Sequence, residues 1–79
     1  MTAEEAVADA ADLAGQLGFE LEVNRIGRIV VRCPPRKLCC TLEPCGQTFQ
    51  VVAGDGKLLY RFWVTLETAL TEIERLTRS

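Results

Sequence analysis

The stretches FELEVN, at residues 19–24, and RIVVRC, at residues 28–33, decide the fold of this chain. In the first stretch apolar and polar residues alternate strictly, and in the second the odd-numbered positions are all apolar. A side-chain period of two indicates extended strands with one face buried and the other facing outward. Similar alternation continues to about residue 62, so the sequence predicts a series of strands between residues 19 and 62.

Helical spacing appears on both sides of this region. Thr2 and Glu5 have the spacing of a capping box, and apolar residues then recur at helical intervals as far as Gly18, which favours a left-handed stop. This pattern predicts a helix over residues 3–17, with an alanine-rich face that suggests close packing. Thr65 is the expected cap of a second helix, whose apolar residues recur every three or four positions: Leu66, Ala69, Leu70, Ile73 and Leu76.

The chain between the two helices divides into short strands and tight connections. Proline and glycine favour turns at 34–37, at 43–46 and at 53–56. Short connections favour sequential antiparallel pairing, with helices over one face of the sheet. The predicted fold is therefore an α+β two-layer sandwich in one domain, residues 1–79. Its four to five antiparallel strands are expected at 19–24, 27–33, 38–43, 47–53 and 57–62.

The composition fits a packed globular domain. The chain has 79 residues, 48% of them hydrophobic and 25% charged, and a formal net charge of −2. A slightly acidic chain is not a default nucleic-acid binder, and its longest apolar run is far too short to span a bilayer. The acidic first residues do not resemble a signal peptide. We expect a cytoplasmic protein without a membrane partner.

Four cysteines lie within thirteen residues: Cys33, Cys39, Cys40 and Cys45. A zinc site would need all four thiolates, because the chain contains no histidine. The spacing has no Cys-x-x-Cys pair, and adjacent cysteines on a strand point to opposite faces. We therefore expect no metal ion.

A disulfide depends on how the strands around the 34–37 turn are aligned. Cys33 and Cys40 are both expected on the inward face, and their sulfur atoms could meet if residue 33 paired with residue 40. A four-residue loop would instead pair Cys33 with Leu38. In a reducing cytoplasm buried thiols are the favoured interpretation. Cys39, expected outward, and Cys45, expected in a turn, could be reactive, so a metal or redox sensor stays a third alternative.

The residue content argues against an enzyme. Without histidine neither a Ser-His-Asp triad nor a Cys-His pair can form within this chain, and its only serine is Ser79. The Gly54-Asp55-Gly56 segment lacks the glycine spacing and the lysine of a phosphate-binding loop. We expect no catalytic residues and no cofactor.

A basic stripe at residues 25–37 supports an alternative function in nucleic-acid binding. It contains five basic residues and no acid: Arg25, Arg28, Arg32, Arg36 and Lys37. Such a stripe could contact phosphates or an acidic protein. Arg28 and Arg32 could equally pair across the sheet with the outward acids Glu20, Glu22 or Glu43.

The helix–strands–helix order resembles that of the double-stranded RNA-binding domain. That family opens its second helix with a lysine cluster that contacts backbone phosphates. In this chain the corresponding positions hold Thr65, Leu66, Glu67 and Thr68, which would repel phosphates. The resemblance therefore extends to the order of the elements alone.

The outward face of the sheet is the expected contact surface. Alternation places there Glu20, Glu22, Arg28, Val30, Arg32, Cys39, Thr41, Glu43, Thr48, Gln50, Val52, Leu59 and Arg61, with Trp63 following. Apolar residues among arginines and a tryptophan are typical of the centre of an interface. The predicted partner-binding residues are Arg28, Val30, Arg32, Val52, Leu59, Arg61 and Trp63.

The first functional interpretation is thus a non-enzymatic protein–protein interaction module: a self-associating subunit, an adaptor or an inhibitor. In size and architecture the chain resembles the small α/β proteins that phages and mobile elements encode, anti-CRISPR inhibitors among them. That resemblance implies a protein as the partner. No motif in the sequence identifies the partner.

Overall fold

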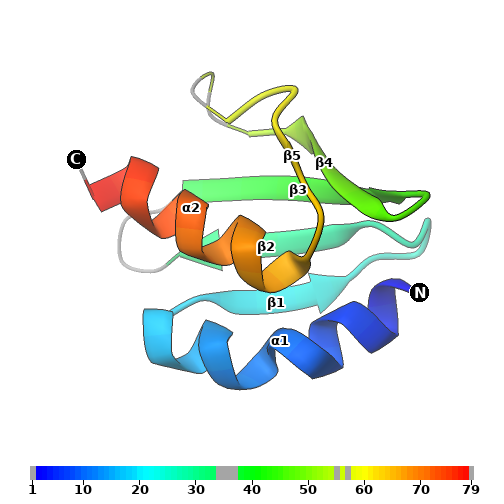
Figure 1. Ribbon diagram of the computed structural model, residues 1–79, viewed down its shortest axis with the longest axis horizontal. Coiled ribbons are helices and arrows are strands. Elements are labelled where there is room, and N and C mark those ends of the chain that lie inside the picture. Colours follow the sequence, from blue (N-terminus) through cyan, green and yellow to red (C-terminus); the bar gives the residue numbers. More distant parts are fainter. Residues whose placement is uncertain (1, 34–37, 55, 57, 79) are drawn as a thin grey trace.

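The computed structural model of the protein describes residues 2–33, 38–54, 56 and 58–78. One helix precedes five strands and a second helix follows them (Figure 1). The strands form one antiparallel sheet in the order β1-β2-β3-β4-β5, which confirms the predicted α+β fold. The elements are α1 (Ala3–Leu17), β1 (Glu20–Val23), β2 (Ile29–Cys33), β3 (Leu38–Cys45), β4 (Thr48–Ala53), β5 (Phe62–Trp63) and α2 (Leu66–Arg78).

Both helices cover the same face of the sheet, and α1 runs alongside β1 and packs against α2 (Figure 1). Side chains from this inward face and from the helices form one hydrophobic core. Its largest fully buried members are Ile29, Leu42, Leu58, Leu70, Ile73, Val31, Val51 and Cys40. In the described part of the chain no helix covers the opposite face, which we call the outward face.

Helix α1 has the limits that its sequence predicts. The Thr2 hydroxyl accepts a hydrogen bond from the Glu5 amide at 3.2 Å, and Gly18 ends the helix with φ of 80°. The buried side of α1 consists of alanines: Ala3, Ala6, Ala10 and Ala14. Because alanine is small, α1 and α2 can approach closely, as the alanine-rich pattern suggests.

Helix α2 likewise begins after its predicted cap. The Thr65 hydroxyl accepts a hydrogen bond from the Thr68 amide at 3.0 Å. Its core face consists of Leu66, Ala69, Leu70 and Ile73, which are all buried. The three- and four-residue spacing of apolar residues therefore identified the buried side of this helix.

The alignment of β2 with β3 settles the pairing of the cysteines in these strands. Cys33 lies opposite Leu38, and Cys40 lies opposite Val31, so the four-residue connection is the one observed. Cys40 is a buried thiol and Cys45 an exposed one. The predicted 34–37 turn lies outside the described residues. The structure describes the backbone of Cys33 and Cys39 but not their side chains, so it does not test the predicted orientations of these two.

The predicted turn at 43–46 is wrong, because β3 continues through Pro44 to Cys45. The chain reverses direction at Gly46 and Gln47, where Gly46 has φ of 63°. Cys45 at the end of β3 then pairs with Thr48 at the start of β4. Pro44 lies beyond Leu42, the last β3 residue that pairs with β2. Its missing N–H therefore removes no ladder bond from that side, and the strand can continue through it.

The predicted strand at 57–62 is also wrong. Residues 58–61 form a turn closed by a hydrogen bond from the Arg61 amide to the Leu58 carbonyl at 3.1 Å, and β5 contains only Phe62 and Trp63. Within this turn Tyr60 has φ of 67°. The predicted turn at 53–56 includes Asp55, which lies outside the described residues.

No helix in the described part of the chain combines the length and the apolar character needed to cross a membrane.

Candidate interaction surface

Exposed apolar residues gather in one short segment. Four large hydrophobic residues are highly exposed in the described chain: Ile26 at 70%, Tyr60 at 78%, Phe62 at 67% and Val64 at 69%. Three of them occupy alternate positions within residues 60–64, in and around the edge strand β5. We call Tyr60, Phe62 and Val64 the edge triplet. Scattered exposed hydrophobic residues are ordinary on small proteins, whereas a contiguous group is typical of an interaction site.

A bulge presents the edge triplet to solvent. The Tyr60 amide donates to the Val51 carbonyl at 3.3 Å, and the Val51 amide donates to the Arg61 carbonyl at 2.9 Å. Two consecutive residues thus oppose one, with the first in the left-handed region, which is the arrangement of a G1 bulge. Glycine normally fills that first position, because a side chain there is strained. Here a tyrosine holds it.

The bulge also reverses the facing of every side chain that follows. One extra residue shifts the two-residue period, so positions expected outward turn inward. Trp63 lies opposite the buried Phe49 and packs against the core, as does Leu59. The predicted outward orientation of Trp63 is therefore wrong. That of Leu59 is wrong as well, although Leu59 precedes the bulge, because it lies in the 58–61 turn and packs against the core. Phe62, expected inward, instead lies opposite Gln50 on the outward face.

The other predicted contact residues on β2 and β4 lie on the outward face, where Val30 and Val52 are half-buried. The prediction for Arg61 is wrong: its backbone bonds opposite the inward-facing Val51, and its charge acts on Glu72 of α2, so this exposed side chain lies on the helix side of the sheet. Val30 lies opposite Glu22 on β1 and Thr41 on β3. The outward face therefore combines two partly exposed valines with Phe62 at its β5 side, without tryptophan.

Glutamates neutralise the two outward arginines. Arg32 Nη1 lies 2.7 Å from Glu22 Oε2, and Arg28 Nη2 lies 3.6 Å from Glu43 Oε2. This is the cross-sheet pairing that the sequence offered as the alternative to phosphate binding. Arg28 and Arg32 each have an acid beside them, so along β2 the basic stripe alternates with negative charge. Arg36 and Lys37 lie outside the described residues.

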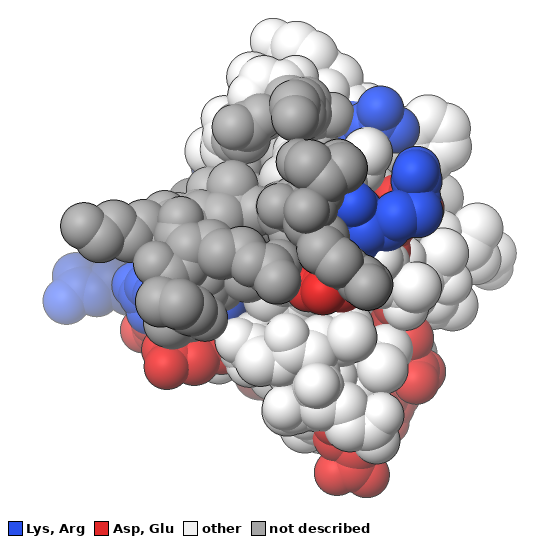
Figure 2. Space-filling view, turned by 90° about the vertical axis from the view of Figure 1, so that its left-hand side faces the viewer, with Lys and Arg blue, Asp and Glu red and all other residues white. Residues whose placement is uncertain are grey.

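Opposite charges also alternate at the end of the molecule where α2 finishes. In Figure 2, basic and acidic side chains lie near one another on this side of the molecule. On α2, Arg75 Nε donates to Glu72 Oε2 at 3.2 Å. The hydrogen bond from Arg75 lowers the pKa of Glu72 below its ordinary value, against an opposing effect of desolvation, and the charges of Arg75 and Arg61 lower it further.

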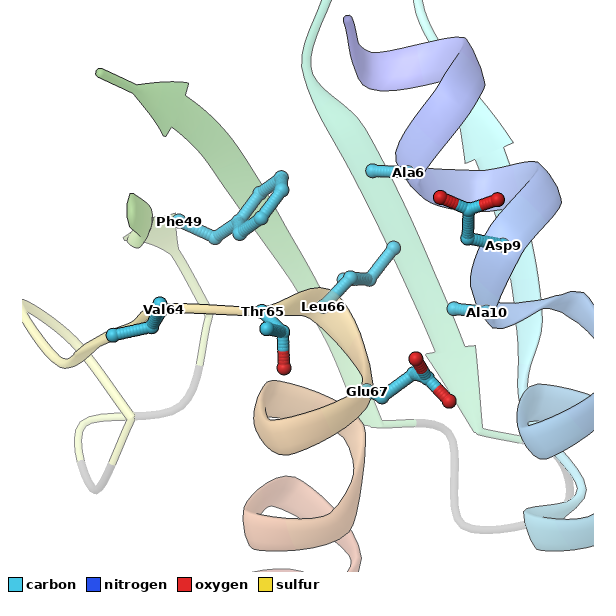
Figure 3. A pocket seen from close by; sticks show the side chains of 8 residues that line it. All are labelled: Ala6, Asp9, Ala10, Phe49, Val64, Thr65, Leu66 and Glu67. Carbon is cyan, nitrogen blue, oxygen red and sulfur yellow. The ribbon is translucent and has the colours of Figure 1, made fainter. Parts of the chain in front are cut away.

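A small depression adjoins the edge triplet (Figure 3). Its volume is about 110 Å³, and it lies between α1, β4 and the start of α2. Apolar side chains form most of its wall, and Asp9 and Glu67 contribute carboxylates from the two helices. The Thr65 hydroxyl in its wall is engaged in capping α2. Of the edge triplet, Val64 borders this depression, which lies on the helix side of the sheet.

The described residues do not assemble a metal site. No group of three or more histidine, cysteine, aspartate or glutamate side chains within the described ranges is placed to hold an ion. Cys40 is buried in the core, while Cys45 is exposed at the end of β3. The alternative of a cysteine-based metal or redox sensor stays a hypothesis, because the structure does not describe the side chains of Cys33 and Cys39.

Comparison with protein-family models, with curated proteins and with solved structures finds no match for this chain.

Proposed function

We propose that this chain is a non-enzymatic protein–protein interaction module whose contact surface is the edge triplet together with the adjoining outward face. One observation carries the proposal: three of the four highly exposed large hydrophobic residues of the described chain lie within five consecutive positions. Aromatic anchors surrounded by polar residues are the usual energetic centre of protein interfaces. The proposed surface contains Tyr60, Phe62 and Val64 in place of the predicted Leu59 and Trp63, together with the outward Val30 and Val52.

Two features support a protein rather than a nucleic acid as the partner. Arg28 and Arg32 already have carboxylates within 4 Å, so a phosphate would have to displace Glu43 and Glu22. The edge triplet has no charge, and apolar burial is a larger source of affinity in protein interfaces than in binding to a phosphate backbone.

Site-specific photo-cross-linking in the native host tests the proposal. A photoreactive phenylalanine analogue at position 62 should give a discrete protein adduct, because Phe62 is at the centre of the proposed surface. The matched control carries the same analogue at Ala11, an exposed position on α1. Equal adducts from positions 62 and 11, or no protein adduct from position 62, would exclude this surface, and a nucleic-acid adduct would favour the alternative function.

A further inference from the structure

We infer that the partner of the edge triplet is a second copy of this chain, paired antiparallel along β5 about a two-fold axis at Phe62. The inference rests on the proposed function and names the occupant of the same surface. In the resulting dimer the two five-stranded sheets join edge to edge into one continuous sheet. Antiparallel pairing of identical strands is self-complementary, as a closed two-fold dimer requires.

The backbone of β5 is arranged for such pairing. The Val51 amide donates to the Arg61 carbonyl across the β4–β5 ladder. Residues that bond to a given neighbouring strand alternate along an antiparallel ladder, so the N–H and C=O of the next residue, Phe62, point to the open edge. About a two-fold axis at Phe62, each copy donates its Phe62 N–H to the Phe62 carbonyl of the other. Both polar groups that the edge exposes at this position are then satisfied.

The side chains of the edge triplet are also self-complementary. Because Phe62 is at the middle of the triplet, an axis at that residue brings the two Phe62 side chains together on the outward face. Val64 of each copy then lies next to Tyr60 of the other. In this pairing every exposed apolar residue of the segment contacts an apolar residue of the other copy. An extended segment of another protein would need apolar residues at the same alternate positions to make these contacts.

The area of the edge triplet fits a weak, reversible dimer. With the exposed fractions above, the edge triplet offers about 400 Å² of surface per copy, since a fully buried aromatic side chain covers roughly 150–250 Å². Two copies together would cover about 800 Å² with these side chains alone, against about 1,200 Å² or more for a stable interface. The paired edge backbone adds to this area. The three side chains of the triplet are uncharged, and the exposed Arg61 between them lies on the side of the sheet that faces Glu72 of α2.

Sedimentation velocity of the purified protein over a range of concentrations tests this inference. We expect a reversible monomer–dimer equilibrium in which Phe62→Lys weakens the dimer about 100-fold, because two like charges then meet at the axis. The matched control is Ile26→Lys, which alters the one comparably exposed hydrophobic residue outside the triplet and should leave the equilibrium unchanged. A wild-type protein that stays monomeric at high concentration overturns the inference, as does equal weakening by both variants.

A charge-swap experiment tests the alignment of the two strands. Val64→Lys and Tyr60→Glu should each weaken their own homodimer, because each places two charges against apolar partners. Mixed together, they should form a heterodimer in preference to either homodimer, since one lysine then faces one glutamate. A purely statistical mixture would overturn the Phe62-centred pairing. If the protein is monomeric but the position-62 adduct contains another protein, the proposed function stands and this inference alone is overturned.

Discussion

Tyr60 is the residue on which the candidate surface depends most. Its left-handed backbone, at φ of 67°, closes the bulge that turns Phe62 outward and Trp63 inward. A non-glycine residue in this region costs about 1–2 kcal/mol. A bulky, exposed side chain in such a position contributes little to the core, which is consistent with a role in contacts outside the monomer.

Replacing Tyr60 by glycine should stabilise the monomer. The variant Tyr60→Gly relieves the left-handed strain, and the greater freedom of glycine in the unfolded chain offsets roughly 0.5–1 kcal/mol of the gain. We expect the free energy of unfolding to rise by about 0.5 kcal/mol in urea titrations at concentrations where the protein is monomeric. Tyr60→Ala, which keeps the strain, is the control and should give no gain. Equal effects of the two substitutions would argue against a strained Tyr60.

Glu72 provides a second test at the residue scale. The hydrogen bond from Arg75, followed by its charge and that of Arg61, lowers the pKa of Glu72 below 4.5, although desolvation opposes this shift. A carboxyl with a lowered pKa in the folded state stabilises the fold above its ordinary pKa. That contribution is lost as the pH falls through the lowered value. In an NMR titration, Arg75→Gln should raise the pKa of Glu72 toward 4.5, and Arg61→Gln should raise it less. An unchanged pKa in Arg75→Gln would contradict this pairing.

At the scale of the elements, both helices could be predicted closely from the sequence, because their signals are local. Thr2, Gly18 and Thr65 act within one turn of their own positions, and the periodic apolar residues mark the buried sides. The first four strands were also predictable in number and order. Their alternation is clear because charged or polar residues interrupt the apolar ones.

The end of the sheet could not be predicted in the same way. Residues 58–64 read LLYRFWV, which is almost continuously apolar, so a period of two assigns no face to any of them. A glycine at position 60 would have indicated the bulge, but that position holds tyrosine. The predicted contact residues on β2 and β4 therefore have the expected orientation, whereas Leu59 and Trp63 pack against the core.

The cap of α2 gives a prediction at this scale. Thr65→Ala removes the acceptor of the Thr68 amide and should lower the free energy of unfolding by about 1 kcal/mol. The control, Thr71→Ala, alters an exposed threonine of the same helix whose hydroxyl bonds only to the Glu67 carbonyl. We expect a change under about 0.5 kcal/mol for this variant. Equal losses in denaturant titrations would show that Thr65 contributes nothing special as a cap.

At the scale of the whole molecule, the two sides of the sheet have different roles. The helices α1 and α2 bury one side and stabilise the fold, while the outward face and the β5 edge are left available for a partner (Figure 1). The other edge of the sheet, β1, carries Glu20 and Glu22 and packs against α1. Charged residues discourage pairing along an edge, so β5 is the edge better suited to it.

The neutralised arginines give a prediction about nucleic acids. Because Glu43 and Glu22 lie beside Arg28 and Arg32, we expect no retention on immobilised DNA or RNA at physiological salt. Replacing both glutamates by glutamine should expose the two arginines and increase retention at low salt. Strong, salt-sensitive binding by the wild-type protein that is lost in the Arg28→Glu, Arg32→Glu variant would instead support the nucleic-acid function.

The most direct test of β5 pairing is hydrogen exchange at two adjacent amides, measured by NMR at low and high protein concentration. The Phe62 amide faces the open edge, whereas the Trp63 amide faces Phe49 on β4. Pairing between copies predicts that protection of Phe62 rises with concentration, because its N–H becomes bonded to the second copy, while protection of Trp63 stays nearly constant. Fast exchange of Phe62 at every concentration would contradict the pairing of two copies along β5.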